Sequence, residues 1–101
     1  RRHVRATDVV GRWGGEEFLI VARTDARTNH GLEEAIKRGR MFAEAGADII
    51  FIESPESEAE MAEIGRSFTQ PLLANMVEGG RTPVLPAEKL KALERENREL
   101  R

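Results

Sequence analysis

Apolar residues in this chain form two kinds of pattern, short continuous runs and faces with helical spacing, and the two kinds alternate. The first two runs, VVGRW and FLIVA, lie between residues 9 and 22. Gly14-Gly15 separates them, and a glycine pair tolerates the positive φ angles of a tight hairpin turn. The pattern therefore predicts an antiparallel hairpin.

A helix is predicted after this hairpin. The tetrapeptide Thr28-Asn29-His30-Gly31 has turn and capping chemistry. Gly39 lies on the apolar face of the helix, where it would allow close packing, and Gly46 is placed to end the helix in a left-handed cap. The apolar residues of that face are Leu32, Ala35, Ile36, Phe42 and Ala43.

A buried strand is predicted next. After Asp48, the run Ile49-Ile50-Phe51-Ile52 is continuous, apolar and largely β-branched. Such a run is typical of a strand that is buried on both faces of a parallel sheet. Pro55 closes it.

The remaining chain predicts two further helices with a short strand between them. Ser57 and Glu60 have the spacing of a capping box at the start of a helix. Residues 71–76 are mostly apolar and predict a strand, whereas residues 78–86 contain the Gly and Pro residues typical of a loop. A last helix begins near Pro86-Ala87, because proline suits the first helical turn, and runs to the end.

This order of elements indicates an α/β fold, with an N-terminal antiparallel hairpin followed by a parallel βαβαβ unit and a C-terminal helix. We interpret the chain as a single domain over residues 1–101. Its parts are a hairpin segment over 1–22, βα units over 18–88 and a C-terminal helix over 87–101.

Composition places the chain among folded proteins with a thin core and a charged exterior. It has 101 residues, of which 40% are apolar and 34% charged. The absence of cysteine excludes disulfides, thiolate metal sites and cysteine nucleophiles. No apolar run approaches the length of a membrane span, which is roughly 18 residues, and the N-terminus has no apolar signal core. We therefore expect a cytoplasmic protein with no membrane partner.

Charge is distributed unevenly along the chain. Residues 1–12 hold four Arg against one Asp, and residues 89–101 hold five basic residues against three acidic ones, so basic ends flank an acidic body. Such ends are able to touch nucleic acid, the acidic body or a second copy of it. No aromatic residues interleave the basic ones, so we expect no nucleic-acid partner.

Residues 5–21, RATDVVGRWGGEEFLIV, resemble the signature of the GGDEF family of diguanylate cyclases. The resemblance implies that Arg5 and Asp8, in the RxxD pattern, bind a cyclic dinucleotide. It also implies that Gly14 and Gly15 let the backbone approach nucleotide phosphates, and that the Glu16 carboxylate ligates Mg²⁺.

Other parts of a cyclase site are not found in this sequence. In that family a second metal-binding aspartate and further nucleotide-binding residues lie in upstream segments, and cyclisation needs two domains face to face. We therefore expect no cyclase activity. The alternatives are that these residues make only a stable hairpin with a polar turn, or that they retain weak binding of cyclic di-GMP.

Three longer motifs resemble the isocitrate lyase and phosphoenolpyruvate mutase superfamily. They are ARTDAR at 22–27, GLEEAIKRGRMFAEAGADIIFIES at 31–54 and PLLANMVEGGRTPVL at 71–85, within a similar stretch over about 18–90. The family fold is a (β/α)₈ barrel, so the segment is expected to be a partial TIM barrel of three consecutive strands. The last motif resembles members that act on small 2-oxo or branched dicarboxylic acids.

The superfamily resemblance also implies three site residues. Arg23 matches the arginine that binds a substrate carboxylate, Glu53 an acidic residue after the next strand, and Asn75 an asparagine after the third. All three follow strands at their C-terminal ends, where barrel enzymes hold their chemistry. Arginine suits one carboxylate and asparagine can hydrogen-bond a second.

The metal of this family is not expected here. Its Mg²⁺-binding aspartates and mobile catalytic loop belong to earlier strands, so we expect no cofactor and no lyase activity, because an enolate would lack its main electrophile. We interpret Asp25 as a turn or capping residue. His3 and His30 share no motif and are expected to be solvated.

The C-terminal helix has heptad spacing. Leu90, Leu93, Asn97 and Leu100 fall at a and d positions, with an asparagine at an a position as in parallel zippers. The string KALERENRELR resembles the zipper region of insertion-sequence transposases. Two alternatives stay open, self-association through this helix and packing of its leucines on the domain.

Together these segments suggest an engineered, generated or recombined α/β scaffold without native catalytic activity, joined within the FLIV strand that both families share in pattern. The alternative is a residual binder of small dicarboxylates or cyclic di-GMP. Three strands of a barrel have an inner face that the other strands of the barrel would normally cover, so something else must pack against it. We therefore expect a homo-oligomer.

Overall fold

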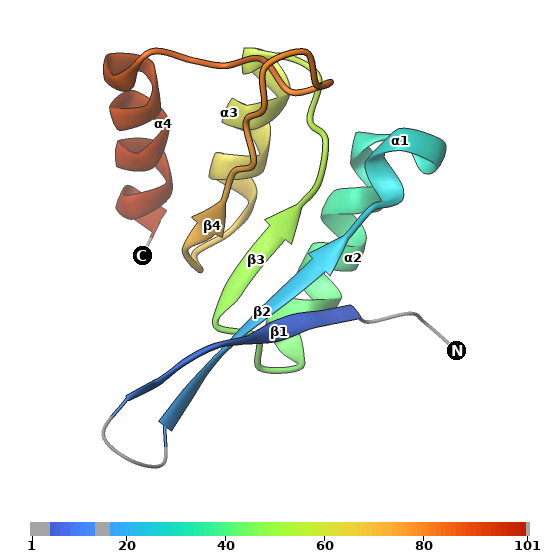
Figure 1. Cartoon of the computed structure of the whole chain (residues 1–101), viewed down its shortest axis with the longest axis vertical. Coiled ribbons are helices and arrows are strands. Elements are labelled where there is room, and N and C mark those ends of the chain that lie inside the picture. Colours follow the sequence, from blue (N-terminus) through green and yellow to red (C-terminus); the bar gives the residue numbers. More distant parts are fainter. Residues whose placement is uncertain (1–4, 14–16, 101) are drawn as a thin grey trace.

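A computed structural model describes residues 5–13 and 17–100 of the chain. Its strands and helices follow the order that the sequence predicts, with one additional short helix (Figure 1). The elements are β1 (Arg5–Trp13), β2 (Glu17–Thr24), α1 (Ala26–His30), α2 (Leu32–Glu44), β3 (Ile49–Ile52), α3 (Glu58–Ser67), β4 (Leu72–Leu73) and α4 (Ala87–Leu100).

The described strands form one sheet in the order β1-β2-β3-β4. β2, β3 and β4 are parallel, which confirms the parallel part of the predicted α/β fold. β1 runs antiparallel to β2, with irregular register between Ala6 and Asp8 and between Val9 and Arg12. The predicted hairpin turn, residues 14–16, lies outside the described residues.

One face of the sheet packs against helices. Alternate residues of a strand point to the same face, so Ala22, Ile50 and Ile52 join one layer of side chains. The helices contribute most of the other side of this core, with Ala35, Ile36, Phe42 and Ile64. The opposite face carries Val21, Arg23 and Phe51, which do not belong to this cluster.

Two glycines of α2 behave as the sequence predicts. Gly46 has φ 107° and lies just past the end of the helix, where the Gly46 and Ala47 amides donate to carbonyls of its last turn. Gly39 lies inside the helix against the core. A Cβ at position 39 would stand 2.6 Å from the ring of Phe68, so the close packing requires glycine.

Two elements differ from the sequence prediction. The tetrapeptide predicted as a turn belongs mostly to α1, which starts where the Ala26 amide donates to Thr24 Oγ1 (3.2 Å) and stops at Gly31 with φ 91°. The strand predicted over 71–76 is only Leu72–Leu73. Its two residues pair with Ile50 and Phe51 of β3, and the pairing ends at Leu73.

The C-terminal helix packs within the chain. Asn97 is only 4% exposed, and its side-chain amide donates to the carbonyls of Phe68 (2.8 Å), Gln70 (3.3 Å) and Gly65 (3.4 Å) at the end of α3. Three of the four heptad residues therefore pack on the domain, as one alternative expects, and self-association through this helix stays a prediction. Leu100 alone of the four heptad residues is exposed.

The helices described here are all too short or too polar to cross a membrane.

Candidate functional site

The three residues that the superfamily resemblance implies lie at one edge of the sheet. Arg23 is the penultimate residue of β2, Glu53 directly follows β3, and Asn75 follows β4 by two residues. Because the three strands are parallel, their C-terminal ends meet at the same edge. The structure therefore brings together side chains that are 52 positions apart in the sequence.

Arg23 is surrounded by two carboxylates and an aromatic ring. Its Nε and Nη2 atoms both lie 2.9 Å from Oδ1 of Asp25, and Nη2 lies 3.5 Å from Oε2 of Glu53. The guanidinium carbon stands 5.2 Å from the centre of the Phe51 ring, a distance typical of a cation–π contact. Phe51 is the cross-strand neighbour of Arg23 in the sheet, so β3 fixes this contact.

The carboxylate of Glu53 accepts two hydrogen bonds within the chain. Its Oε1 atom accepts a hydrogen bond from the Ser54 amide (3.2 Å), and its Oε2 atom accepts one from Nδ2 of Asn75 (3.4 Å). Ser54 has φ 64°, the left-handed region that non-glycine residues rarely adopt. Such backbone strain is common at functional sites, and here it lies directly after Glu53.

Asp25 has a role that the sequence did not predict. It occupies the position before the first residue of α1, as a capping residue would, but its side chain makes no cap hydrogen bond. The carboxylate pairs with Arg23 instead. Strand alternation does not indicate this contact, because Asp25 lies beyond the end of β2 with φ −102° and ψ 13°.

The group formed by Arg23, Asp25 and Glu53 carries one positive and two negative formal charges. An incoming anion therefore meets a guanidinium that is already paired. Asn75 adds an uncharged donor beside them. Chemically, this arrangement can hold a carboxylate at Arg23 and hydrogen-bond a second polar group at Asn75, provided that one of the internal carboxylates gives way.

A second ionic cluster joins α1 to α3 near this edge. Nε and Nη2 of Arg27 bind the two carboxylate oxygens of Glu60 at 2.8 and 2.6 Å, and Nη2 also lies 3.4 Å from Glu56. The hydrogen bond from Arg27 holds the pKa of Glu60 below its usual value, and the same bond raises the pKa of Arg27.

The predicted capping box of α3 is formed in part. Ser57 Oγ accepts from the Glu60 amide (3.1 Å), as predicted. The Glu60 carboxylate accepts from the amide of Glu56 (2.8 Å), one residue before the one that a capping box uses. The bidentate bond with Arg27 explains the difference, because it places the carboxylate toward α1.

Of the other predicted site residues, the structure brings Arg5 to this edge, because Arg5 is the cross-strand partner of Arg23. Arg5 and Asp8 belong to β1, where they are the backbone partners of Arg23 and Val21. His30 is exposed, as expected. Outside the described residues lie His3, Gly14, Gly15 and Glu16.

A magnesium site does not fit the residues at this edge. Within residues 5–13 and 17–100, no three His, Cys, Asp or Glu residues are grouped so that they could hold a metal ion. Asp25 and Glu53, the two carboxylates available, both pair with Arg23. We therefore assign no step of any chemistry here to a metal.

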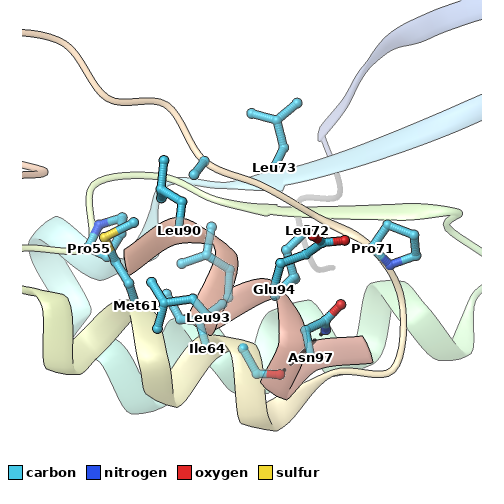
Figure 2. A pocket seen from close by; sticks show the side chains of 13 residues that line it. Pro55, Met61, Ile64, Pro71, Leu72, Leu73, Leu90, Leu93, Glu94 and Asn97 are labelled. Carbon is cyan, nitrogen blue, oxygen red and sulfur yellow. Dashed lines mark hydrogen bonds between the residues drawn. The ribbon is translucent and has the colours of Figure 1, made fainter. Parts of the chain in front are cut away.

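A separate cavity of about 270 Å³ lies between α3, α4 and the segment around β4 (Figure 2). Its walls are mostly apolar, and Glu94 is the charged residue among them. A carboxylate would find no cation in the wall, and neither Arg23, Glu53 nor Asn75 lines it. The apolar side chains labelled in Figure 2 are Pro55, Met61, Ile64, Pro71, Leu72, Leu73, Leu90 and Leu93.

Comparison with protein families gives a match over almost the whole chain. The family model described as phosphoenolpyruvate phosphomutase matches residues 2–95. The chain is 60% identical over 77 residues to 2,3-dimethylmalate lyase of Eubacterium barkeri, and 49% identical over 75 residues to 2-methylisocitrate lyase of Aeropyrum pernix. These alignments cover 76% and 74% of this chain, but 27% and 24% of the two relatives.

Solved structures give the same result. A crystal structure of 2,3-dimethylmalate lyase, described as a PEP mutase/isocitrate lyase superfamily member, matches 74% of this chain with a TM-score of 0.70 and 38% identity. Oxaloacetate acetylhydrolase in complex with the product oxalate matches the same share with a TM-score of 0.70 and 37% identity. The chain spans about a quarter of the length of these relatives.

The family match begins at residue 2 and so includes the segment whose sequence resembles the cyclase signature. None of these matches points to a diguanylate cyclase or to a transposase. Both of those resemblances stay predictions, as does the recombined origin that they suggest.

Proposed function

Because the chain belongs to the phosphoenolpyruvate phosphomutase family, we propose that Arg23, Glu53 and Asn75 form the carboxylate-binding part of a lyase-type site. The observation that carries the proposal is the connected group at the sheet edge. Three polar side chains from three successive parallel strands meet there, and Glu53 contacts both of the others.

The class of ligand is supported by the relatives. Their names refer to dimethylmalate, methylisocitrate and oxaloacetate, and one solved structure contains oxalate. All of these are small acids with two or more carboxylates. We therefore propose that the site of this chain takes small dicarboxylic acids.

Each residue has a distinct part in the proposed binding. Arg23 supplies charge and a planar set of N–H donors to one carboxylate. Asn75 can donate its side-chain amide to the second carboxylate. Glu53 orients both donors through its Oε2 atom, and Phe51 supports the guanidinium from below.

We propose further that the chain by itself binds such acids without cleaving them. Carbon–carbon cleavage through an enolate needs an electrophile that takes up the developing charge. At the sheet edge Arg23 already faces two carboxylates, and Asn75 is neutral. The described residues therefore support binding better than bond cleavage.

Titration calorimetry with malonate, a small dicarboxylate, tests the binding proposal. We expect saturable binding to the unaltered chain and a loss of at least about tenfold in affinity for Arg23→Ala, because the ligand loses its cation. Arg38→Ala is the matched control, since Arg38 pairs with Glu34 on the surface of α2 and should leave binding unchanged. Equal affinity of Arg23→Ala and the unaltered chain would disprove the proposal.

A separate assay tests the absence of cleavage. Purified chain is incubated with oxaloacetate and Mg²⁺, and loss of oxaloacetate is followed against Mg²⁺ alone. We expect the two rates to agree. A rate well above the metal-only background that disappears in Arg23→Ala would show that the chain is catalytic.

A further inference from the structure

The cavity between α3, α4 and β4 differs in chemistry from the carboxylate site at the sheet edge (Figure 2). Leu90 and Leu93 of α4, Met61 and Ile64 of α3 and Leu72 of β4 are among the residues that line it. An apolar cavity of about 150 Å³ is enough to hold benzene. This cavity measures about 270 Å³, so it has room for a molecule of two fused rings.

The polar atoms of the cavity wall already have partners within the chain. Asn97 lines the cavity, and its side-chain amide donates to three backbone carbonyls at the end of α3. Among the described residues, no buried side-chain nitrogen or oxygen atom lacks a hydrogen-bond partner. A ligand therefore needs no hydrogen-bonding group in order to fit this wall.

Charge complementarity favours a neutral ligand. Of the residues that line the cavity, Glu94 is the charged one, and its carboxylate accepts a hydrogen bond from Arg98 on the same helix. The Glu94 side chain is 54% exposed, so a cation gains little from it, and the wall offers an anion no cation at all. Either kind of ion would lose water of hydration without a strong partner in return.

We infer that this cavity is a binding site for small, neutral, apolar molecules of about the size of indole. Such a ligand removes the aliphatic walls from water, which drives its binding. The Met61 thioether adds a favourable contact with an aromatic ring. The inference does not depend on the proposed carboxylate binding, because Arg23, Glu53 and Asn75 do not line the cavity.

NMR titration of the whole chain with indole tests the inference. The chain has three methionines, Met41, Met61 and Met76, whose methyl signals serve as separate probes. Met61 lines the cavity, whereas Met41 and Met76 do not. We expect indole to shift the Met61 signal saturably and to leave the other two unchanged. A Met61 signal that does not respond to indole would overturn the inference.

Three analogues of indole test the class of ligand. Tryptophol, tryptamine and indole-3-acetate carry the same ring system with a neutral, a cationic and an anionic side chain. We expect tryptophol to bind at least about tenfold more tightly than either charged analogue. Equal or tighter binding of tryptamine would show that Glu94 recruits cations and that the inferred neutral class is wrong.

Variants of α4 test the location. Leu93→Trp places a larger side chain in the cavity and should weaken indole binding at least about tenfold. Leu100→Trp is the matched control, because Leu100 is exposed on the same helix and does not line the cavity. Leu90→Phe takes the place of Leu93→Trp if that variant fails to fold. Equal affinities of the filled variant and Leu100→Trp would show that indole binds elsewhere.

A second copy of the chain is the competing occupant of this cavity. Its entry would move the Met61 signal as protein concentration rises in the absence of indole. A Met61 signal that depends on protein concentration and not on indole would assign the cavity to contact between copies, and the inference would be wrong. Malonate binding, which depends on Arg23, is measured separately, so failure of either proposal leaves the other standing.

Discussion

Gly39 and Gly65 both lie inside helices, but they differ in the space available for a side chain. A Cβ at position 39 would stand 2.6 Å from Cζ of Phe68 and 3.2 Å from Ile50, inside the core. A Cβ at position 65 would find the Leu93 carbonyl at 3.6 Å, an ordinary contact. The same substitution should therefore have opposite effects at the two sites.

We expect Gly39→Ala to destabilise the fold by about 1–2 kcal/mol, because overpacking a core outweighs the better helix propensity of alanine. Gly65→Ala should stabilise it by about 0.5–1 kcal/mol, from propensity alone. Urea unfolding followed by circular dichroism measures both free energies of unfolding. Each variant serves as the control for the other, and changes of the same sign would contradict the packing described.

Asn97 gives a second test at the scale of one residue. Asn97→Ala would leave buried carbonyls at the end of α3 without a donor, which should cost about 1–3 kcal/mol of unfolding free energy. Asn97→Leu should also destabilise the chain, since leucine cannot donate to those carbonyls.

Asn97→Leu distinguishes packing of α4 on α3 from self-association of α4 as a zipper. At the a position of a parallel zipper, replacement of asparagine by an aliphatic residue raises stability at the expense of register. A more stable Asn97→Leu whose stability increases with protein concentration would therefore contradict the packing of α4 on α3. Denaturant unfolding at two protein concentrations provides the measurement.

At the scale of elements, the bond between Arg27 and Glu60 ties α1 to α3 and should make stability depend on pH. The folded pKa of Glu60 is lower than its ordinary value of 4.5. A carboxyl group of this kind stabilises the fold above its unfolded pKa, and the stabilisation is lost as pH falls through the folded pKa. The contribution is thus complete at pH 7 and absent in strong acid.

Glu60→Gln tests this linkage. We expect the difference in unfolding free energy between the unaltered chain and the variant to be largest near pH 7 and to shrink below pH 4.5. Glu44→Gln, at an exposed position of α2, should give a small difference at every pH. A Glu60→Gln difference that stays constant down to pH 2 would exclude the proposed linkage.

Elements were predictable where one local signal was enough. The continuous run Ile49–Ile52 is β3, Gly46 ends α2 in a left-handed conformation, and Ser57 caps α3. The lengths of β4 and α1 were not predictable. They depend on backbone pairing with β3 and on a capping bond from Thr24, which involve neighbouring segments.

The candidate site shows the same division between local and long-range information. Arg23, Glu53 and Asn75 were named from motifs, and the parallel sheet explains why they meet. The contacts of Arg23 with Asp25 and Phe51 were not predicted. The first requires the bend between β2 and α1, and the second requires the register that places Phe51 beside Arg23.

At the scale of the whole molecule, family membership over residues 2–95 confirms the superfamily resemblance that the sequence motifs indicated. The three parallel strands are part of the fold of solved members of that superfamily. The cyclase-like segment is different, because Arg5 and Asp8 lie on β1, whereas Gly14, Gly15 and Glu16 lie outside the described residues.

The sheet face opposite the helices bears on how the whole molecule behaves in solution. Cross-strand partners lie on the same face, so Arg23, Phe51 and Leu73 form one row across the sheet. Leu73 is 40% exposed although it belongs to a strand, and Val77 and Val84 in the loop after β4 are also exposed. Exposed apolar residues beside a short edge strand favour association with another sheet.

We therefore expect two copies of the chain to associate through this face. Light scattering should give a solution mass of about twice 11.3 kDa at high concentration. Leu73→Lys places a charge in the row and should shift the chain toward a monomer, while far-UV circular dichroism stays the same. Leu100→Lys is the matched control, since Leu100 is similarly exposed but lies at the end of α4. A monomer at every concentration, or equal effects of the two lysines, would show that the row does not mediate association.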